Sequence, residues 1–203
     1  GFRVPNVFDL STLGPRPGNG FNMPNLGLDP ERVVTVDVGA KWESSRFRAE
    51  VFGFYSDFQD KITDLPTGDF TAEGRQVVQS QNLNAVELWG VEAAGRWSVS
   101  EGWEVFGSFT YTWAQEESQT GQKEPASRIP PANGQVGGVY TLSDAVWIEG
   151  FVRFAADQNR LSERDTSDPR INPNGTPGWV SVNLRIGWQI NEYVSIKGAL
   201  ENM

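Results

Sequence analysis

The sequence contains neither cysteine nor histidine among its 203 residues. Without cysteine there can be no disulfides, which mildly disfavours a soluble secreted domain, because secreted domains often depend on them. Without histidine the chain lacks the most common metal ligand and general base, so zinc hydrolysis and Ser-His catalysis within it are close to excluded. We therefore expect no metal site, no cofactor and no enzymatic activity.

Long hydrophobic runs and basic runs are also missing. No stretch of about 18 apolar residues exists, which excludes a helical membrane protein. The opening residues, GFRVPN, lack the basic start and apolar segment of a signal peptide, so we expect any export signal to lie upstream. The net charge is −9, from 26 acidic and 17 basic residues, and nucleic acid is not an expected partner because phosphate binding needs a positive patch.

What the sequence does contain is strict alternation of apolar and polar residues, most clearly in residues 178–201. Its first arm places Val182, Leu184, Ile186 and Trp188 at every second position, with polar residues between them. After Asn191 and Glu192 the alternation resumes. Side chains on a strand alternate between faces, so each arm has one apolar and one polar face, and the short connection predicts a hairpin.

The same alternation recurs along the chain and predicts an all-β fold, an antiparallel up-and-down meander of about eight strands. The expected strands cover residues 32–43, 46–57, 82–97, 103–113, 135–142, 145–156, 178–190 and 193–201. Short turns at 43–45, 98–101, 143–144 and 191–192 alternate with long polar loops at 59–81, 115–133 and 157–177. Residues 1–30, rich in Pro, Gly and Asn, are expected to be irregular.

Two kinds of protein carry such two-faced strands. In a soluble sandwich the apolar face meets a core, and in a membrane barrel it meets lipid while the polar face meets a wet lumen. The strict alternation of short turns and long loops favours the barrel, because a Greek-key sandwich has no reason to collect its long loops at one end. Trp42, Trp97, Trp103 and Trp113 near strand ends suit the aromatic girdles of a membrane interface.

Four segments, taken in order, resemble the C-terminal barrel region of a TonB-dependent outer-membrane receptor. They are GFRVPN at 1–6 with Asp9 and Leu10; Asn25-Leu26 with Pro30-Glu31; NAVELWGVEAAG at 84–95; and Arg128-Ile129-Pro130 with the closing Leu200-Glu201-Asn202. Met203 departs from the family, which usually has Leu there. The resemblance implies that residues 1–203 are a single, partial β-barrel region of a 22-stranded transmembrane barrel, with the plug domain and the final strand not present.

The resemblance also implies a function: part of an energy-coupled outer-membrane receptor that imports a scarce nutrient such as a ferric siderophore, haem or a glycan. The implied location is the outer membrane of a Gram-negative bacterium. The implied partners are a small-molecule nutrient ligand, outer-membrane lipid, and a TonB-type energy-coupling protein that acts through the plug.

Two sets of charged residues are candidates for contact. Loop residues are the better place for ligand contact, since barrel strands are scaffold, and the charged loop supplies the candidate ligand-binding residues Arg160, Arg164, Asp165, Asp168 and Arg170. Charged residues on the polar strand faces are expected to form mixed charge ladders along an inner wall that packs on the plug. They are Asp37, Lys41, Arg48, Glu50, Glu92, Arg96, Glu104, Arg185, Lys197 and Glu201.

Alternatives remain open. A complete eight-stranded outer-membrane barrel acting as an enzyme or an adhesin has a permitted strand number, and a soluble sandwich could bind sugars through its tryptophans. The pairing between the strands at 32–43 and 193–203 separates these readings. A continuous ladder there would close a small barrel, whereas a part of a larger barrel predicts that the two strands do not pair.

Overall fold

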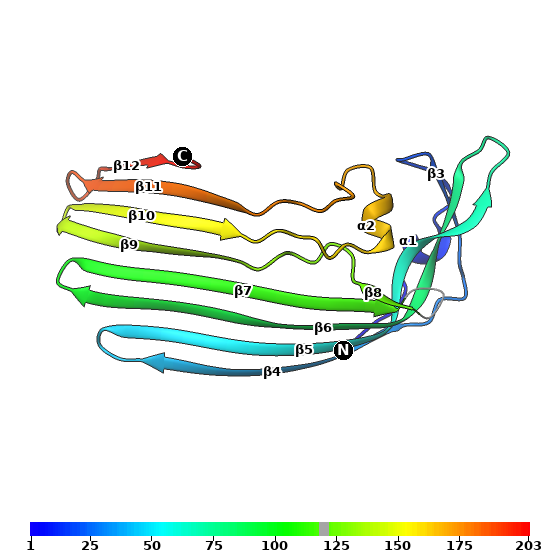
Figure 1. Ribbon diagram of the computed structural model, residues 1–203, viewed down its shortest axis with the longest axis horizontal. Coiled ribbons are helices and arrows are strands. Elements are labelled where there is room, and N and C mark those ends of the chain that lie inside the picture. Colours follow the sequence, from blue (N-terminus) through cyan, green and yellow to red (C-terminus); the bar gives the residue numbers. More distant parts are fainter. Residues whose placement is uncertain (118–121) are drawn as a thin grey trace. The chain divides into compact units, whose positions relative to one another are not determined.

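The structure, a computed structural model, describes residues 1–117 and 122–203, and its eight long strands form one meander (Figure 1). Strands that follow one another along the chain are neighbours in the sheet, in the order β4-β5-β6-β7-β9-β10-β11-β12. They are β4 (Glu31–Glu43), β5 (Phe47–Phe70), β6 (Gln76–Ser100), β7 (Trp103–Glu117), β9 (Asn133–Ser143), β10 (Val146–Ala155), β11 (Trp179–Gln189) and β12 (Ser195–Leu200). The predicted all-β, up-and-down meander of about eight strands is confirmed.

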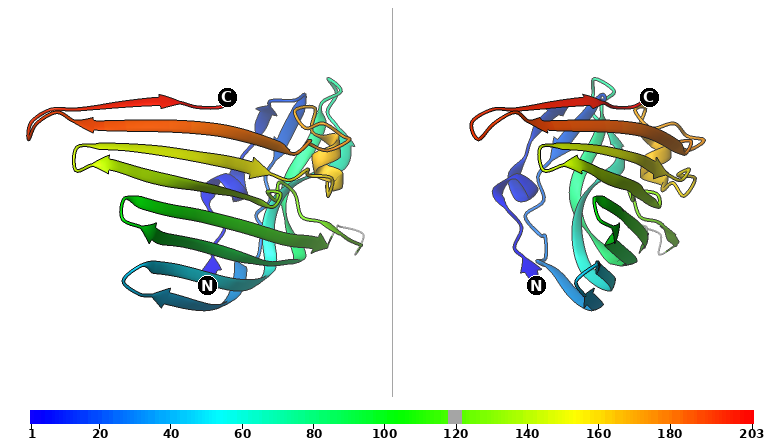
Figure 2. Two further views of the ribbon diagram at one scale, coloured as in Figure 1. Left: turned by 60° about the vertical axis from the view of Figure 1, so that its left-hand side comes forward. Right: turned by 90° about the vertical axis from the view of Figure 1, so that its left-hand side faces the viewer.

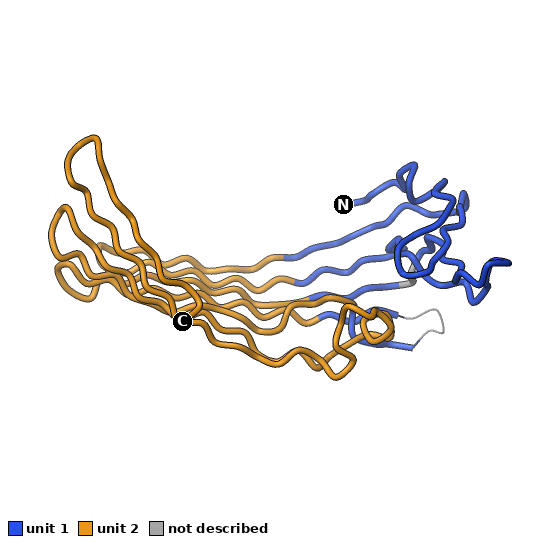
Figure 3. The backbone as a smooth tube through the Cα atoms, turned by 90° about the horizontal axis from the view of Figure 1, so that it is seen from above, with its two compact units in different colours: residues 1–36, 55–88, 114–126 blue, residues 37–54, 89–113, 127–203 orange. Residues whose placement is uncertain are grey.

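The chain divides into two compact units, coloured separately in Figure 3. Unit 1 comprises residues 1–36, 55–88 and 114–126, and unit 2 comprises residues 37–54, 89–113 and 127–203. Each unit is described in turn.

Unit 2 holds the four short turns, which connect the strands at residues 44–46, 101–102, 144–145 and 190–194. These positions agree with the predicted turns to within one to three residues. The strands from β9 to β12 lie side by side (Figure 2) in antiparallel register, with Gly138 opposite Gly150, Gly150 opposite Leu184, and Leu184 opposite Leu200. Gly102 takes a φ of 76° in its turn, a conformation that favours glycine.

Unit 1 contains a correction to the predicted strands. The polar loop expected at 59–81 is wrong, because β5 continues to Phe70 and β6 begins at Gln76, which leaves a turn of five residues between them. The extended hairpin buries Ile62 and Val78, and β6 also pairs in parallel with β3 (Gly20–Met23). Polar composition predicted a loop here, but pairing with neighbouring segments decides the strand.

The first 30 residues, predicted to be irregular, also carry short elements: β1 (Phe2–Arg3), α1 (Val7–Ser11), β2 (Gly14–Arg16) and β3. Asn6 and Asp9 form a reciprocal capping box on α1. The Arg3 guanidinium donates to Asp9 at 2.7 Å and to Glu31 at 2.5 Å, and Glu31 accepts from the Ile62 amide at 2.7 Å. These polar contacts order a segment rich in proline and glycine.

The other two predicted loops are also shorter or more structured than expected. Strand β7 continues to Glu117, and β8 (Lys123–Pro125) pairs with it, while residues 118–121 of the predicted loop 115–133 lie outside the described residues. The loop after β10 contains α2 (Glu163–Ser167) and a bridge between Gln158 and Thr176.

The two end strands of the meander do not pair with each other. In the sheet formed by the described residues, β12 pairs with β11, and β4 lies between β1 and β5. The predicted absence of a ladder between residues 32–43 and 193–203 is therefore confirmed, which argues against closure into an eight-stranded barrel. None of the helices in the described part of the chain is long and apolar enough to cross a membrane.

Candidate ligand site

The strands have an apolar face that stays exposed and a polar face that is more covered. On β11 the exposed fractions are 45% for Val182, 40% for Leu184 and 46% for Ile186, whereas Ser181 and Asn183 between them are 8% and 4% exposed. The predicted facing is thus confirmed. A soluble domain would bury the apolar side, so an exposed apolar face over several strands marks a surface that meets lipid or another protein.

Aromatic clusters mark both ends of this apolar face in unit 2. Trp103 stacks on Tyr140, with ring centroids 4.5 Å apart, next to the short turns. Toward the other end of β7, Trp89 stacks on Trp113 at 5.8 Å and meets Tyr111 edge-on at 5.7 Å. The two clusters on β7 are ten residues apart, or about 33 Å along the strand at ~3.3 Å per residue. A tilt of about 40° reduces this to about 25 Å, the height of the apolar band of an outer-membrane barrel.

The opposite face carries ion pairs between neighbouring strands. Lys41 forms a salt bridge with Glu50 at 3.2 Å, and Arg96 forms one with Glu104. Arg185 forms salt bridges with both Glu149 and Glu201. Mixed charge ladders were predicted on this face, and these pairs confirm them, although Asp37, Glu92 and Lys197 form no ion pair with any described residue. Their partly exposed side chains make each pair worth about 0–1 kcal/mol, so they shape the wall more than they stabilise it.

The charged loop at residues 156–178 is organised by Asp165, one of the predicted ligand residues. Its carboxylate accepts from Ser127 Oγ at 2.7 Å and from the Arg128 and Ser162 amides at 3.3 Å each, and Ser162 Oγ accepts from the Asp165 amide. Burial alone raises the pKa of this carboxyl group, but the hydrogen bonds outweigh it and hold the pKa below its ordinary value. Asp165 is 3% exposed, so it holds the loop together from within.

Asp168, the next predicted residue, is held by two arginines. Arg170 donates to its carboxylate at 2.7 and 2.9 Å, and Arg128 at 3.0 Å. Hydrogen bonds from the Arg170 side chain and backbone hold the pKa of Asp168 far below its ordinary value, and the carboxylate in turn raises the pKa of Arg170. The guanidinium groups of Arg128 and Arg170 are largely exposed, so the cluster presents positive charge to solvent.

The remaining two candidates lie apart from this cluster. Arg160 stacks its guanidinium 4.7 Å from the ring centroid of Trp113, on the apolar face of β7. Arg164 is exposed on α2. The structure therefore does not gather the five predicted residues into one site, and their role in ligand contact stays a prediction.

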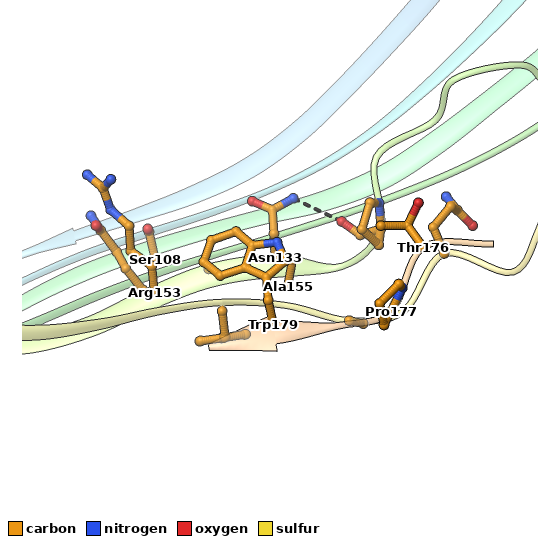
Figure 4. Close-up of a pocket in the computed structure, with 13 residues that line it drawn as sticks. Ser108, Asn133, Arg153, Ala155, Thr176, Pro177 and Trp179 are labelled. Carbon is orange, nitrogen blue, oxygen red and sulfur yellow. Dashed lines mark hydrogen bonds between the residues drawn. The ribbon is translucent and has the colours of Figure 1, made fainter. Parts of the chain in front are cut away.

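A cleft that the sequence did not indicate lies on the polar face of unit 2, where β7, β9, β10 and β11 meet the base of this loop (Figure 4). Its volume is about 570 Å³. Its lining residues are Ser108, Pro131, Asn133, Gly134, Gln135, Arg153, Phe154, Ala155, Ala156, Gln158, Thr176, Pro177 and Trp179. Asn133 is held in place by donating to the Pro131 carbonyl at 2.9 Å, and Trp179 projects on the same side.

Strand register explains why these side chains converge. Gln135 lies opposite both Ser108 and Arg153, and Asn133 and Trp179 both lie opposite Ala155. Arg153 is separated by an even number of residues from Glu149, which pairs with Arg185, so both belong to the polar face. In the sequence the only signal was a mixed polar and aromatic face on the sixth strand. Cross-strand partners are not visible without the register.

Comparison with known proteins places the whole chain in one family. The family model described as "TonB dependent receptor-like, beta-barrel" matches residues 1–203. An iron-regulated outer membrane virulence protein of Vibrio cholerae is 28% identical, covering 100% of this chain and 32% of its own length.

Solved structures give the same fold. The copper transporter OprC superposes with a TM-score of 0.80 at 18% identity, over 99% of this chain and 29% of that one. A mutant ferric enterobactin receptor from Pseudomonas aeruginosa, in complex with enterobactin, gives 0.75 at 16% identity, over 100% of this chain and 31% of that one. The chain thus spans about a third of the length of these relatives.

Proposed function

Because the chain belongs to the TonB-dependent receptor family, whose β-barrel region it matches from end to end, we propose that it forms part of an outer-membrane receptor that imports a ferric siderophore. The main support is this match, together with a meander whose strands have one apolar and one polar face. The apolar face measures about 25 Å along the membrane normal between its two aromatic clusters. The relative from Vibrio cholerae, described as iron-regulated and outer-membrane, supports iron as the nutrient and a Gram-negative outer membrane as the location.

In this proposal the apolar face meets outer-membrane lipid and the ion-paired face lines the lumen. The barrel would belong to a 22-stranded receptor, with the other strands and the plug supplied by the rest of the protein. A TonB-type protein would supply energy through the plug. The chain itself contributes walls and loops and performs no chemistry on the ligand.

The loop at 156–178 is proposed as a first contact for an anionic ligand. Arg164 and Arg170 present exposed guanidinium groups there, and the buried cap formed by Ser162 and Asp165 fixes the helix that carries Arg164. Prepositioned arginines suit carboxylate and catecholate oxygens because the guanidinium offers several donors in a fixed geometry.

Uptake of radioactive iron tests the proposal. Cells that lack the full-length receptor should lose uptake of at least one ferric siderophore under iron limitation, and the intact gene should restore it. Uptake should also stop when the energy-coupling protein is removed. If the deletion strain takes up every siderophore tested, as well as haem, at the rate of its parent, iron import is the wrong function.

A further inference from the structure

Two loops of unit 1 that are far apart in the sequence form one small sheet. Strands β2 and β3 come from the first loop, and they add to the hairpin that β5 and β6 form beyond residue 60, in the order β2-β3-β6-β5. An isolated ribbon of two strands is marginally stable in water, whereas three or more strands with a buried apolar face are stable. Ile62 and Val78 supply that face, and each is 9% exposed. The first loop therefore stiffens the second.

Side-chain contacts join the same two loops along their length. Arg16 forms a salt bridge with Asp64 at 3.1 Å, and Ser80 donates to the same carboxylate at 2.9 Å. Three more hydrogen bonds cross between the loops, from Asn19 to the Gly74 carbonyl at 3.3 Å, from Gln79 to the Pro24 carbonyl at 2.7 Å and from Asn25 to the Ser80 carbonyl at 2.9 Å. One loop cannot shift against the other without breaking several of these bonds together.

The Asn82 side chain joins the base of this sheet to the start of β4. Its amide accepts from the Asp29 backbone amide at 2.9 Å, and it donates to the carbonyls of Asp29 at 2.9 Å and of Asp60 at 2.6 Å. These bonds use both donor hydrogens of the side chain. Asp60 takes a φ of 56°, a left-handed conformation that interrupts the regular geometry of β5 at this point. The bonds of Asn82 thus lie where the first loop leads into β4 and where β5 departs from an extended strand.

From these contacts we infer that residues 13–25 and residues 61–81 form one rigid arm, which turns about the Asn82 side chain. Neither loop moves without the other, so any event that displaces one loop, such as contact with a ligand, displaces both. The ladder between β3 and β6 and the Asp64 cluster hold the arm together, and the left-handed residue in β5 is the point at which it bends. This inference goes beyond the proposed function, because it concerns the coupling of two loops and not the nature of the ligand.

Distances between spin labels on the purified full-length receptor in detergent test the inference. The 203 residues contain no cysteine, so labelled pairs can be introduced in them. Leu13→Cys with Ala72→Cys reports the distance within the arm, and Arg32→Cys with Ala72→Cys reports the distance from the arm to β4. All three positions are exposed. The wild-type distribution within the arm should be narrow. Asn82→Ala should broaden the distribution from the arm to β4 and leave the distribution within the arm unchanged.

Asn172→Ala is the matched control. It removes the same amide from a loop of unit 2, where Asn172 accepts from the Asn174 amide, and it should change neither distribution. The inference is overturned if Asn82→Ala broadens both distributions alike or neither of them. It is also overturned if the wild-type distribution within the arm is as broad as the one from the arm to β4 in Asn82→Ala.

A disulfide between the loops gives a second, functional measurement. Asn22 and Val78 are partners in the parallel ladder and line the same cleft, so their backbones lie about 4.8 Å apart, within the reach of a disulfide. The double variant Asn22→Cys and Val78→Cys should take up iron equally fast when oxidised and when reduced, because the loops stay together. A loss of uptake on oxidation that reduction restores would show that the loops must separate. The spin-label distances need no transport, so they test the arm even if the proposed import function fails.

Discussion

Leu184→Arg in β11 probes whether the apolar face meets lipid. Leu184 is 40% exposed on the protein alone and lies four residues from Trp188. Four residues cover about 13 Å of strand, or about 10 Å along the membrane normal at a tilt of about 40°, close to the middle of a 25 Å apolar band. An arginine at the midplane of a barrel wall costs about 2–4 kcal/mol, and the cost falls to about 0–1 kcal/mol near the interface.

This gives a graded expectation along one strand. Leu184→Arg should lower the free energy of unfolding by about 2–4 kcal/mol, Ile186→Arg by less, and Ile190→Arg, beyond Trp188, by at most about 1 kcal/mol. Ile186 and Ile190 have almost the same exposed fraction, 46% and 44%. On a water-exposed surface all three substitutions would change stability by about 0.5 kcal/mol or less, so only depth in lipid predicts the gradient.

The assay is guanidinium unfolding of the full-length receptor in lipid vesicles, followed by tryptophan fluorescence and extrapolated linearly to zero denaturant. Leu184→Phe is the control, because it keeps an apolar side chain in lipid and should change stability little. Equal and negligible effects at the three arginine positions would refute the assignment of this face to the membrane.

Two further predictions concern the loop and the sheet. The folded pKa of Asp165 lies below its unfolded value of 3.8. The ionised carboxylate therefore stabilises the loop fully above pH 3.8, and this stabilisation is lost as the pH falls below that value. Hydrogen exchange at residues 162–168 should accelerate as the pH falls in the wild type, and it should be fast at all pH values in Asp165→Asn. Gly137→Ala should destabilise the barrel by about 1–3 kcal/mol, because an added Cβ would lie 2.6 Å from the Gly150 carbonyl oxygen. A Cβ added at Gly150 has no atom within 4 Å, so Gly150→Ala should be nearly neutral in the same unfolding assay. Equal losses for the two glycine variants would contradict the close approach.

The predictions made from sequence succeeded where one physical rule acts locally. Alternation along β11 predicted which side of Leu184 and Asn183 is covered, because successive side chains on a strand must point to opposite faces. The same rule located four short turns and the eight long strands. It failed at residues 59–81, where apolar and polar residues do not alternate regularly. There β5 pairs with β6, and β3 pairs with the start of β6, and this pairing keeps the segment extended.

The candidate site was also predicted only in part from the sequence. Sequence could mark the loop at 157–177 as charged, but it could not foresee that Asp165 turns inward to cap a five-residue helix or that Arg160 lies on Trp113. The capping contact with Ser162 is local, but the burial of Asp165 also depends on Ser127 and Arg128, 38 and 37 positions away. Arg160 lies 47 positions from Trp113 along the chain. The cleft at Arg153 was equally invisible.

The sequence by itself determined the architecture and the family. The architecture follows from the local alternation of apolar and polar residues, and the family follows from short motifs in a fixed order. Tertiary structure alone decided which charges form ion pairs across strands. Arg153 and Arg185 stand on similar polar strand faces, yet only the cross-strand register gives Arg185 two carboxylates and Arg153 two neutral partners, Gln135 and Ser181. A charge interacts with its neighbours in space, and the register that selects those neighbours is set by the pairing of whole strands.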